Sequence, residues 1–431
     1  MSGRDLRSAV RAVGGLGLAA ALLAGVVPAA HAAATISLVP YRMDGSNQAG
    51  WWKPIEEFGG RVFVAYNAWG SPTASGTGDT HTVYVAKREL DGTWSRGCMQ
   101  DTPGHCAIVG DDVGHRQPTI AIDGDGYVHA FFDMHGSSWR YYRSASPEDV
   151  GAMVNRAAEM PDQDASVTYP VAARAANGDV YLIVRDHTAG KMYRWSNASN
   201  MWTRVATFAT EANRSVYPDD VAGTGNGDVH IAWEWARGAA GGLRHAGSYL
   251  RYSPATNQFS DPAGTPTTVP VTSTSEVAYQ PLEGVESFEA GDFTYDPGVQ
   301  SAKLAITADG RPLVAYRYRD TPGGTFRVRL AEWTGSGWQR SLVYQGIYDT
   351  YAAVDVTTHA SGVRVYYAKN QTIADNHAFV SARQPDGSWA ETLLLADVPV
   401  ERLAVIRRGG IDHLYLASPS TWQLHNGSLP W

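Results

Sequence analysis

The run Gly124–Phe132, with the sequence GDGYVHAFF, decides the fold because it joins a tight turn directly to a strand. Gly and Asp favour turns, and the apolar and aromatic residues that follow favour strands. Related runs bring the number of copies to seven, which predicts a repeat architecture. The seven copies are Gly59–Tyr66, Gly124–Phe132, Asn177–Val184, Asn226–Trp233, Asp309–Tyr316, Ser361–Tyr367 and Gly409–Leu416.

Further strands surround each copy, and most copies are spaced near 50 residues apart. In the first unit, the strand-like run His81–Lys87 precedes a Gly-Trp turn at Asp91–Trp94. Four short strands in each of seven units predict an all-β fold, a seven-bladed β-propeller with four-stranded antiparallel blades. We expect one domain, 33–431, in which Thr35–Val39 completes the blade that begins near Arg402 and so removes an open edge. No helical periodicity of useful length is present.

The first residues have the pattern of a secretory signal peptide. Three arginines precede the apolar run Val13–Pro28, and Ala30–Ala32 fits a small-residue cleavage signal. We therefore expect residues 1–32 to be removed and the protein to be secreted and extracellular. No later stretch approaches the roughly 18 apolar residues of a membrane-spanning helix, so we expect no membrane association after cleavage.

The composition favours a carbohydrate ligand over nucleic acid. The chain has 14 Trp and 22 Tyr, and charged residues make up only 18%. Most of these aromatic residues belong in a β-sheet core, but some can line a carbohydrate cleft. The formal charge of −8 gives no global excess of cations for binding phosphates. A local cationic pocket for an acidic sugar remains compatible with these numbers, and we expect a monomer.

Two features suggest cross-links or metals. Cys98 and Cys106 are the two cysteines and lie in one loop, so we expect a disulfide between them. A zinc site formed with His105 is the alternative, but no fourth ligand is evident. The segment Asp123–Asp125 could bind a structural calcium ion, although a plain β-turn is the better interpretation.

Four residues form the candidate catalytic group: His115, His135, Tyr169 and Arg185. The two histidines are 20 residues apart, and Tyr169 and Arg185 are 16 residues apart. Each pair flanks a Gly-containing turn between two strands, so each pair is expected at the same end of one hairpin. A base, an acid and a cation suit proton abstraction next to a carboxylate. Singly, each residue could be structural, and Arg185 could pair with Asp186 at the surface.

Other residues fall at the equivalent end of their repeats and are candidate substrate contacts. These are Asn67, Arg116, Tyr217, Arg237 and His245. Tyr217-Pro218 repeats the dipeptide Tyr169-Pro170, which favours a structural role for at least one of the two tyrosines.

Four segments resemble the seven-bladed propeller polysaccharide lyases. That family includes the propeller ulvan lyases and rhamnose-glucuronate lyases and is grouped with the neuraminidase-like BNR-repeat proteins. The segments are Gly114–Ala121, Phe132–Gly136, Thr168–Pro170 and Val184–Asp186. The resemblance in architecture covers essentially the whole mature chain, but its specific motifs lie in the second and third repeats.

The resemblance implies proton-transfer and substrate-polarising roles for His115 and His135, the complementary acid or base role for Tyr169, and a carboxylate clamp at Arg185. The segment Trp233–Arg237 is similar to the family's tryptophan and arginine motif, but Ala236 separates the last pair. Intact sialidase boxes are absent from the sequence, and only fragments such as Asp386–Trp389 remain.

The implied reaction is β-elimination at the bond from L-rhamnose to O4 of glucuronate, as found in ulvan and in arabinogalactan side chains. Histidine, with a reference pKa of about 6.5, suits a base, and tyrosine, with one near 10, suits an acid. We assign His115 as base and Tyr169 as acid, and the reverse is nearly as well supported. No cofactor is required for this chemistry. Alternatives are a propeller hydrolase, either an α-L-rhamnosidase or a sialidase, and a non-catalytic glycan-binding propeller.

Overall fold

The structure, a computed structural model, describes residues 33–47, 52–69, 80–110, 117–237, 244–275, 277–280, 299–318, 325–347, 353–369 and 376–431. Residues Ala33–Trp431 form one compact unit. The expected signal peptide, residues 1–32, lies outside the described residues, so the peptide and the domain boundary stay predictions. Within the described ranges, no helix is both long and apolar enough to cross a membrane.

The described strands form six hydrogen-bonded sheets. One sheet of ten strands contains β2 (Ile55–Phe58), β3 (Arg61–Trp69), β4 (Thr80–Arg88), β5 (Trp94–Thr102), β6 (His105–Cys106), β7 (Val109–Gly110), β8 (Thr119–Ile122), β9 (Val128–Phe131), β11 (Tyr141–Ser144) and β12 (Met153–Asn155). The next sheet has five strands: β10 (His135–Ser137), β13 (Val167–Arg174), β14 (Val180–Asp186), β15 (Ala189–Ser196) and β16 (Met201–Ala209). A second sheet of five strands contains β17 (Arg214–Gly223), β18 (Val229–Arg237), β19 (Arg244–Ser253), β20 (Gln258–Ser260) and β21 (Ala278–Gln280).

Three sheets of four strands complete the set. They contain β22 (Val299–Ile306), β23 (Pro312–Tyr318), β24 (Phe326–Trp333) and β25 (Trp338–Ile347), then β26 (Val354–His359), β27 (Gly362–Lys369), β28 (His377–Arg383) and β29 (Trp389–Leu393), and finally β30 (Arg402–Arg408), β31 (Ile411–Ser418), β32 (Gln423–Pro430) and β1 (Thr35–Leu38). Among the described residues, the single helix is the short 3₁₀ segment η1 (Ala157–Glu159).

Each of the seven repeated runs forms a turn followed by a strand, and these strands are β3, β9, β14, β18, β23, β27 and β31. In the third copy, Gly178 takes a φ of 87°, a conformation in which glycine avoids the strain of a side chain. All seven residues of β14 are buried. The strand is covered on both faces by neighbouring sheets, which explains why its first five residues, Val180–Val184, are all apolar or aromatic rather than alternating.

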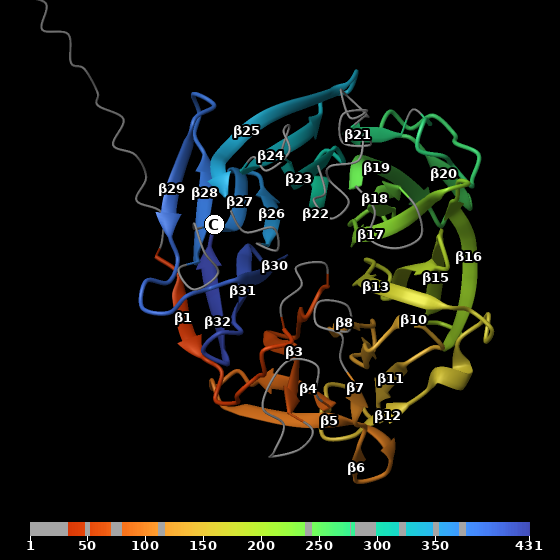
Figure 1. Ribbon diagram of the computed structural model, residues 1–431, viewed down its shortest axis with the longest axis vertical. Coiled ribbons are helices and arrows are strands. Elements are labelled where there is room, and N and C mark those ends of the chain that lie inside the picture. Colours follow the sequence, from red (N-terminus) through yellow and green to blue (C-terminus); the bar gives the residue numbers. More distant parts are fainter. Residues whose placement is uncertain are drawn as a thin grey trace, which may run out of the picture. The chain divides into compact units, whose positions relative to one another are not determined.

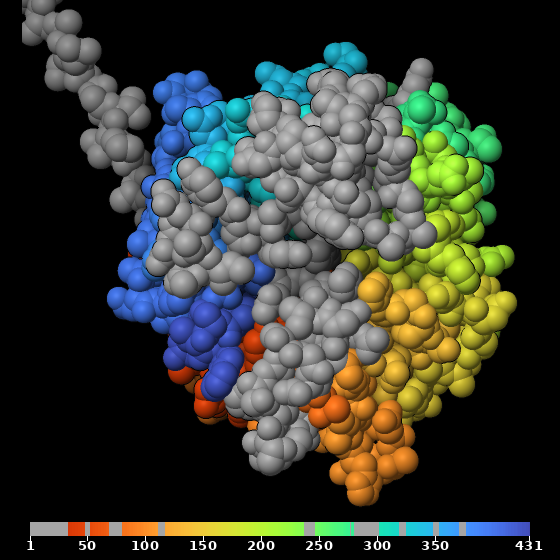
Figure 2. Space-filling model, in the orientation of Figure 1, coloured from red at the N-terminus to blue at the C-terminus, as the bar shows by residue number. Residues whose placement is uncertain are grey.

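The innermost strands are arranged in a closed series. In chain order, β2, β8, β13, β17, β22, β26 and β30 each lie against the next, and β30 lies against β2. Figure 1 shows the sheets following one another around a common centre. Figure 2 shows the same order on one face, where the blue C-terminal region lies beside the red N-terminal strand. The fold is therefore all-β and propeller-like, as predicted, although six separate sheets do not by themselves give the predicted count of seven blades.

The first and last strands close the ring, which confirms the role predicted for Thr35–Val39. Strand β1 pairs antiparallel with β32, from Thr35 opposite Ser428 to Leu38 opposite His425. The pairing adds the N-terminal segment as the outer strand of the last sheet. It holds the two ends of the ring together by backbone hydrogen bonds.

A different contact joins the first two repeats into the ten-stranded sheet. Strand β12 pairs parallel with β5, with Met153 opposite Met99. The strands can approach because a Cβ on Gly97 would lie only 1.7 Å from the carbonyl oxygen of Val150. Nearby, the predicted disulfide between Cys98 and Cys106 is present, with a Cα–Cα distance of 5.5 Å.

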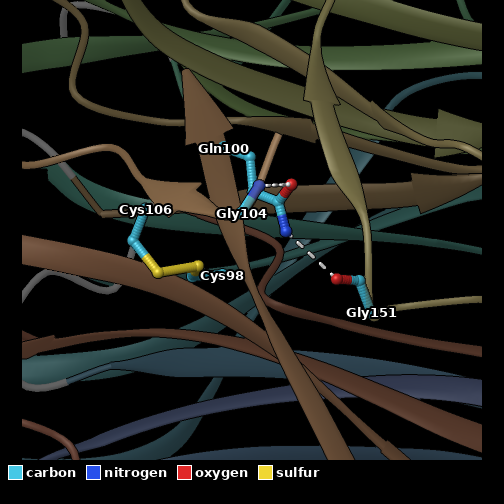
Figure 3. The surroundings of a disulfide bond; sticks show 5 residues. All are labelled: Cys98, Gln100, Gly104, Cys106 and Gly151. Carbon is cyan, nitrogen blue, oxygen red and sulfur yellow. Dashed lines mark hydrogen bonds between the residues drawn. A yellow bond between two sulfur atoms is a disulfide. The ribbon is translucent and has the colours of Figure 1, made fainter. Parts of the chain in front are cut away.

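The disulfide confirms one sequence prediction and excludes another. Both sulfurs are used in the bond, so neither Cys98 nor Cys106 is free to bind zinc. Gln100 lies between them in the chain and accepts a hydrogen bond from the Gly104 amide while donating to the carbonyl of Gly151 (Figure 3). The disulfide loop is thus fastened to the segment that leads into β12.

We predict that Gly427→Ala weakens ring closure. A Cβ at this position in β32 would lie 2.8 Å from Ile36 Cγ1 and 3.0 Å from the backbone oxygen of Thr35. Overpacking of this kind lowers the free energy of unfolding by about 1–3 kcal/mol. Urea unfolding measures the change, with Gly337→Ala as the control because its Cβ would meet open space. Equal stability of the two variants would contradict the prediction.

We also predict that His230 contributes to acid sensitivity. Its Nδ1 lies 2.6 Å from the Tyr249 hydroxyl, and burial lowers the pKa of His230 to about 3. Below its ordinary value of 6.5, the unfolded chain binds a proton that the folded chain does not. The stabilisation is therefore complete above pH 6.5 and is lost as the pH falls towards 3. In urea unfolding, His230→Gln should reduce the change of the free energy of unfolding with pH by up to about 1.4 kcal/mol per pH unit. The substitution His359→Gln, at an exposed position, should not.

Candidate active site

The hairpin of β13 and β14 brings two of the predicted catalytic residues together. Thr168 in β13 is opposite Arg185 in β14, and the register then shifts before Val171. Tyr169, within this bulge, has a φ of 56°, which is unusual for a residue with a side chain. A bulge re-aims a side chain locally. Tyr169 and Arg185 therefore lie at the same end of one hairpin, as the sequence predicts.

Arg185 packs against two neighbouring tyrosine rings. Its Cζ is 4.8 Å from the ring centroid of Tyr169 and 4.6 Å from that of Tyr217 on the neighbouring sheet. The two ring centroids are 5.1 Å apart. A guanidinium over aromatic faces is attracted by their negative potential. This arrangement fixes the position of the cation without neutralising its charge.

The guanidinium of Arg185 is buried but incompletely bonded. The residue is 6% exposed, and its Nε and Nη1 have no hydrogen-bond partner in the part of the chain that the structure describes. Buried cations are normally paired, because desolvation without a partner is costly. A planar guanidinium with free donors is suited to receive a carboxylate. Arg185 therefore has the properties expected of an anion-binding residue.

The neighbouring Asp186 does not supply that anion through a surface ion pair, which was the alternative for Arg185. Instead, the Asp186 carboxylate lies 2.6 Å from Lys191 Nζ and accepts a hydrogen bond from the Ser166 amide at 2.8 Å. Burial alone would raise the pKa of Asp186, but these bonds and one from His187 outweigh it and lower the pKa. Asp186 thus anchors the end of the hairpin.

Two further aromatic residues surround Tyr169. His135 in β10 pairs with Thr168, and its ring centroid is 6.3 Å from that of Tyr169. The ring of Trp52 meets Tyr169 edge-on at 5.8 Å. Trp52, Tyr169 and Tyr217 belong to one buried apolar cluster with Ala236. The sequence analysis missed Trp52, although its place just before the first inner strand was an available signal.

The remaining predicted site residues are placed in part. His115 and Arg116 lie outside the described residues, as do the side chains of Arg237 and His245, whose backbones belong to β18 and β19. Asn67 is buried in β3 and donates through Nδ2 to Ser46 Oγ at 3.0 Å. Its surroundings are thus those of a structural residue, and its predicted contact with sugar stays a prediction.

The Asp123–Asp125 segment is a turn. The Asp123 carbonyl accepts a hydrogen bond from the Gly126 amide, and its Oδ1 accepts bonds from the amides of Asp125 and Tyr127. Its Oδ2 lies 3.1 Å from His129 Nε2. No group of three or more His, Cys, Asp or Glu within the described ranges could hold a metal ion. Calcium binding stays a prediction.

The fold and the site together define a propeller-like protein with a buried cation, Arg185, that is a candidate for binding an anion. The chain belongs to the BNR repeat-containing family, whose model matches residues 61–345. This membership, together with the relatives below, confirms the family resemblance predicted from the sequence.

Two curated relatives are ulvan lyases. The chain is 24% identical over 302 residues to an ulvan lyase of polysaccharide lyase family 25 from Pseudoalteromonas sp. strain PLSV, covering 62% of this chain and 59% of that protein. It is 27% identical over 259 residues to an ulvan lyase from Alteromonas sp. strain LOR, covering 52% of this chain and 51% of that protein. The chain thus spans between half and three-fifths of the length of these relatives.

Solved structures show the same fold over a larger share of the chain. A family 25 ulvan lyase superposes with a TM-score of 0.65 and 17% identity, covering 90% of this chain and 95% of that one. Another structure of such a lyase contains a bound glucuronate–rhamnose 3-sulfate saccharide. The polysaccharide lyase Uly1 superposes with a TM-score of 0.62 and 13% identity, covering 88% and 90% of the two chains.

We predict that Arg185→Met leaves the folded protein about as stable as the wild type, within about 1 kcal/mol, because it removes a buried charge that has no carboxylate partner among the described residues. Arg364 provides the contrast, since it is equally buried but lies 3.0 Å from Asp412. Arg364→Met should lower the free energy of unfolding by about 3–5 kcal/mol. Urea unfolding distinguishes the two, and similar losses would show that Arg185 is an ordinary structural residue.

Proposed function

We propose that the protein is a secreted polysaccharide lyase that cleaves the L-rhamnose-α-1,4-D-glucuronate bond of an acidic polysaccharide by β-elimination. The observation that carries the proposal is Arg185, a buried guanidinium beside the ring of Tyr169, whose Nε and Nη1 have no partner within the described ranges. Such a cation stabilises the negative charge that develops on a uronate when its C5 proton is removed.

In the proposed reaction, the uronate carboxylate pairs with Arg185. A base removes the proton from C5, the electron pair forms the C4–C5 double bond, and the bond from C4 to the rhamnose-linked oxygen breaks. An acid protonates that oxygen, so the products are an unsaturated uronate and a free rhamnose end. His115 is assigned as base and Tyr169 as acid, with the reverse assignment still open, and His135 orients these groups or shares the proton transfer. No cofactor takes part in these steps.

The similarity to two proteins named ulvan lyases supports the substrate class. The saccharide bound in the related lyase structure contains glucuronate and rhamnose 3-sulfate. The same proposal includes arabinogalactan side chains, which contain the linkage at a chain end. Contacts from Tyr217, and from Arg116, Arg237 and His245, would bind the sugars that flank the cleaved bond. We propose that the protein acts outside the cell as a monomer.

We further propose a seven-bladed propeller within one domain, 33–431. Two observations support this count. Seven inner strands form the closed series from β2 to β30, and the ten-stranded sheet divides naturally into two units that are joined by the parallel pairing of β5 with β12.

The test of function is the ultraviolet absorbance of the unsaturated uronate during incubation with ulvan and, separately, with gum arabic. The wild type should form the product, and Tyr169→Phe should reduce the rate by about 10²–10⁴ because one proton transfer is lost. Arg185→Lys should also reduce it strongly, because an ammonium cannot pair bidentately with the carboxylate.

The matched control is Tyr181→Phe. Tyr181 is a fully buried tyrosine of the same hairpin, its hydroxyl has no partner among the described residues, and it belongs to the core beside Val171. It should retain full activity. Release of rhamnose without a rise in absorbance would instead indicate a hydrolase, and sugar binding without any product would indicate a glycan-binding protein.

A further inference from the structure

A cavity of about 830 Å³ runs along the inner strands, and its lining includes the charged residues Lys53, Asp220, Lys303 and Asp355. Lys303 and Asp355 are buried, and burial lowers the pKa of Lys303. Burial, together with the Asp220 carboxylate, raises the pKa of Asp355 to about 7. Both shifts have the same cause, which is that the charged forms of Lys303 and Asp355 are costly to keep in a buried environment.

Asp220 and Asp355 connect neighbouring sheets through the same pattern of bonds. Asp220 Oδ1 accepts a hydrogen bond from the Val221 amide, and its Oδ2 accepts one from Leu304 of β22. Asp355 is bonded in the same way to the Val356 amide and to Val405 of β30. Each carboxylate therefore ties its own inner strand to the next sheet.

Lys53 connects segments that are far apart in the sequence. Its Nζ lies 2.8 Å from Asp220 Oδ1 and donates to the Val221 carbonyl at 2.9 Å, so the side chain links the segment before β2 to β17. Its backbone amide donates to Thr119 Oγ1 at 2.7 Å, and its carbonyl accepts from the Ile120 amide at 2.9 Å. The residue is thus fixed to two other inner strands, β8 and β17.

Both partners of this ion pair are close in sequence to the walls of the candidate active site. Lys53 directly follows Trp52, whose ring packs on Tyr169. Asp220 comes three residues after Tyr217, beyond the register shift between Pro218 and Asp220. The pair therefore spans the two segments that hold Tyr169 from either side.

We infer that Lys53 and Asp220 are positioning residues for the proposed lyase reaction: their ion pair fixes Trp52 and Tyr217 against Tyr169 and so sets the orientation of Tyr169 and Arg185. The expected change in turnover rests on the proposed function, but the expected effect on the positions of the tyrosine rings does not. An ion pair suits this task because its bonds are directional, whereas apolar contacts allow the strands to slide. Removing the ammonium would also leave a carboxylate in the cavity without its counter-ion.

The experiment compares Lys53→Met with Lys369→Met. Lys369 forms an ion pair with Glu391 at 2.6 Å, and its side chain is 17% exposed, close to the 19% of Lys53, but it belongs to β27. Proteins are labelled with ¹³C at the tyrosine ring carbon that carries the hydroxyl, and the resonances of Tyr169 and Tyr217 are assigned from their Phe variants. Turnover and KM are then measured on the polymer that the wild type degrades.

Lys53→Met should move both tyrosine resonances and lower kcat at least tenfold with a smaller change in KM, while Lys369→Met should do neither. Lys53→Arg, which keeps the charge, should restore most of the rate. If Lys53→Met does not fold, Lys53→Gln, which keeps a hydrogen-bond donor, is compared in the same way.

Unchanged resonances in folded Lys53→Met or Lys53→Gln would overturn the inference. So would a loss of rate no larger than that of Lys369→Met. If the wild type forms no unsaturated product, the proposed function fails, but the resonances still decide whether Lys53 and Asp220 position the tyrosines.

Discussion

Closure of the ring is the constraint on which the rest of the structure depends. Each sheet is covered on both faces by its neighbours, so no sheet can bury its apolar residues unless the series is complete. The pairing of β1 with β32 completes it by joining segments from opposite ends of the chain. The cavity along the inner strands is lined by residues of both β2 and β30, so its walls are complete only once β30 lies against β2. A weakness at this seam would therefore disturb the segment of Trp52, which directly precedes β2, and with it the candidate site.

Irregularities in the inner strands make the site possible. Register shifts occur in β13, β17 and β22, and Tyr169 and Ser301 have positive φ values within two of them. A regular strand would send alternate side chains into the cores between sheets. The bulge in β13 instead turns Tyr169 towards Arg185, and the shift in β17 separates Tyr217 from Asp220. The fold supplies rigid strands, and its local departures from regularity supply the chemistry.

Much of this could be predicted from the sequence, because turns and strands are encoded locally. The seven turn-strand runs, the disulfide and the shared hairpin end of Tyr169 and Arg185 all follow from residues close together in the sequence. The closing strand followed instead from the requirement that the ring has no open edge. The contacts of Trp52 could not be predicted in that way, and neither could the ion pair of Lys53 with Asp220, which are 167 residues apart. These depend on which inner strands become neighbours after closure. Tyr169-Pro170 did contain a signal for the bulge, since proline cannot donate to a strand ladder.

Arg185 has a consequence for how the protein meets its ligand. Its guanidinium has already lost most of its hydration shell during folding, and two tyrosine rings hold it in place. A carboxylate that binds Arg185 would lose its own hydration shell, but it would not need to displace water from the guanidinium. Little reorganisation of the protein would then be needed before the reaction. If Arg185 binds the substrate carboxylate as proposed, we expect the same desolvated cation to favour other carboxylates. Simple carboxylates such as free glucuronate should compete with the polymer, and buffers that contain them would mask the affinity of the site.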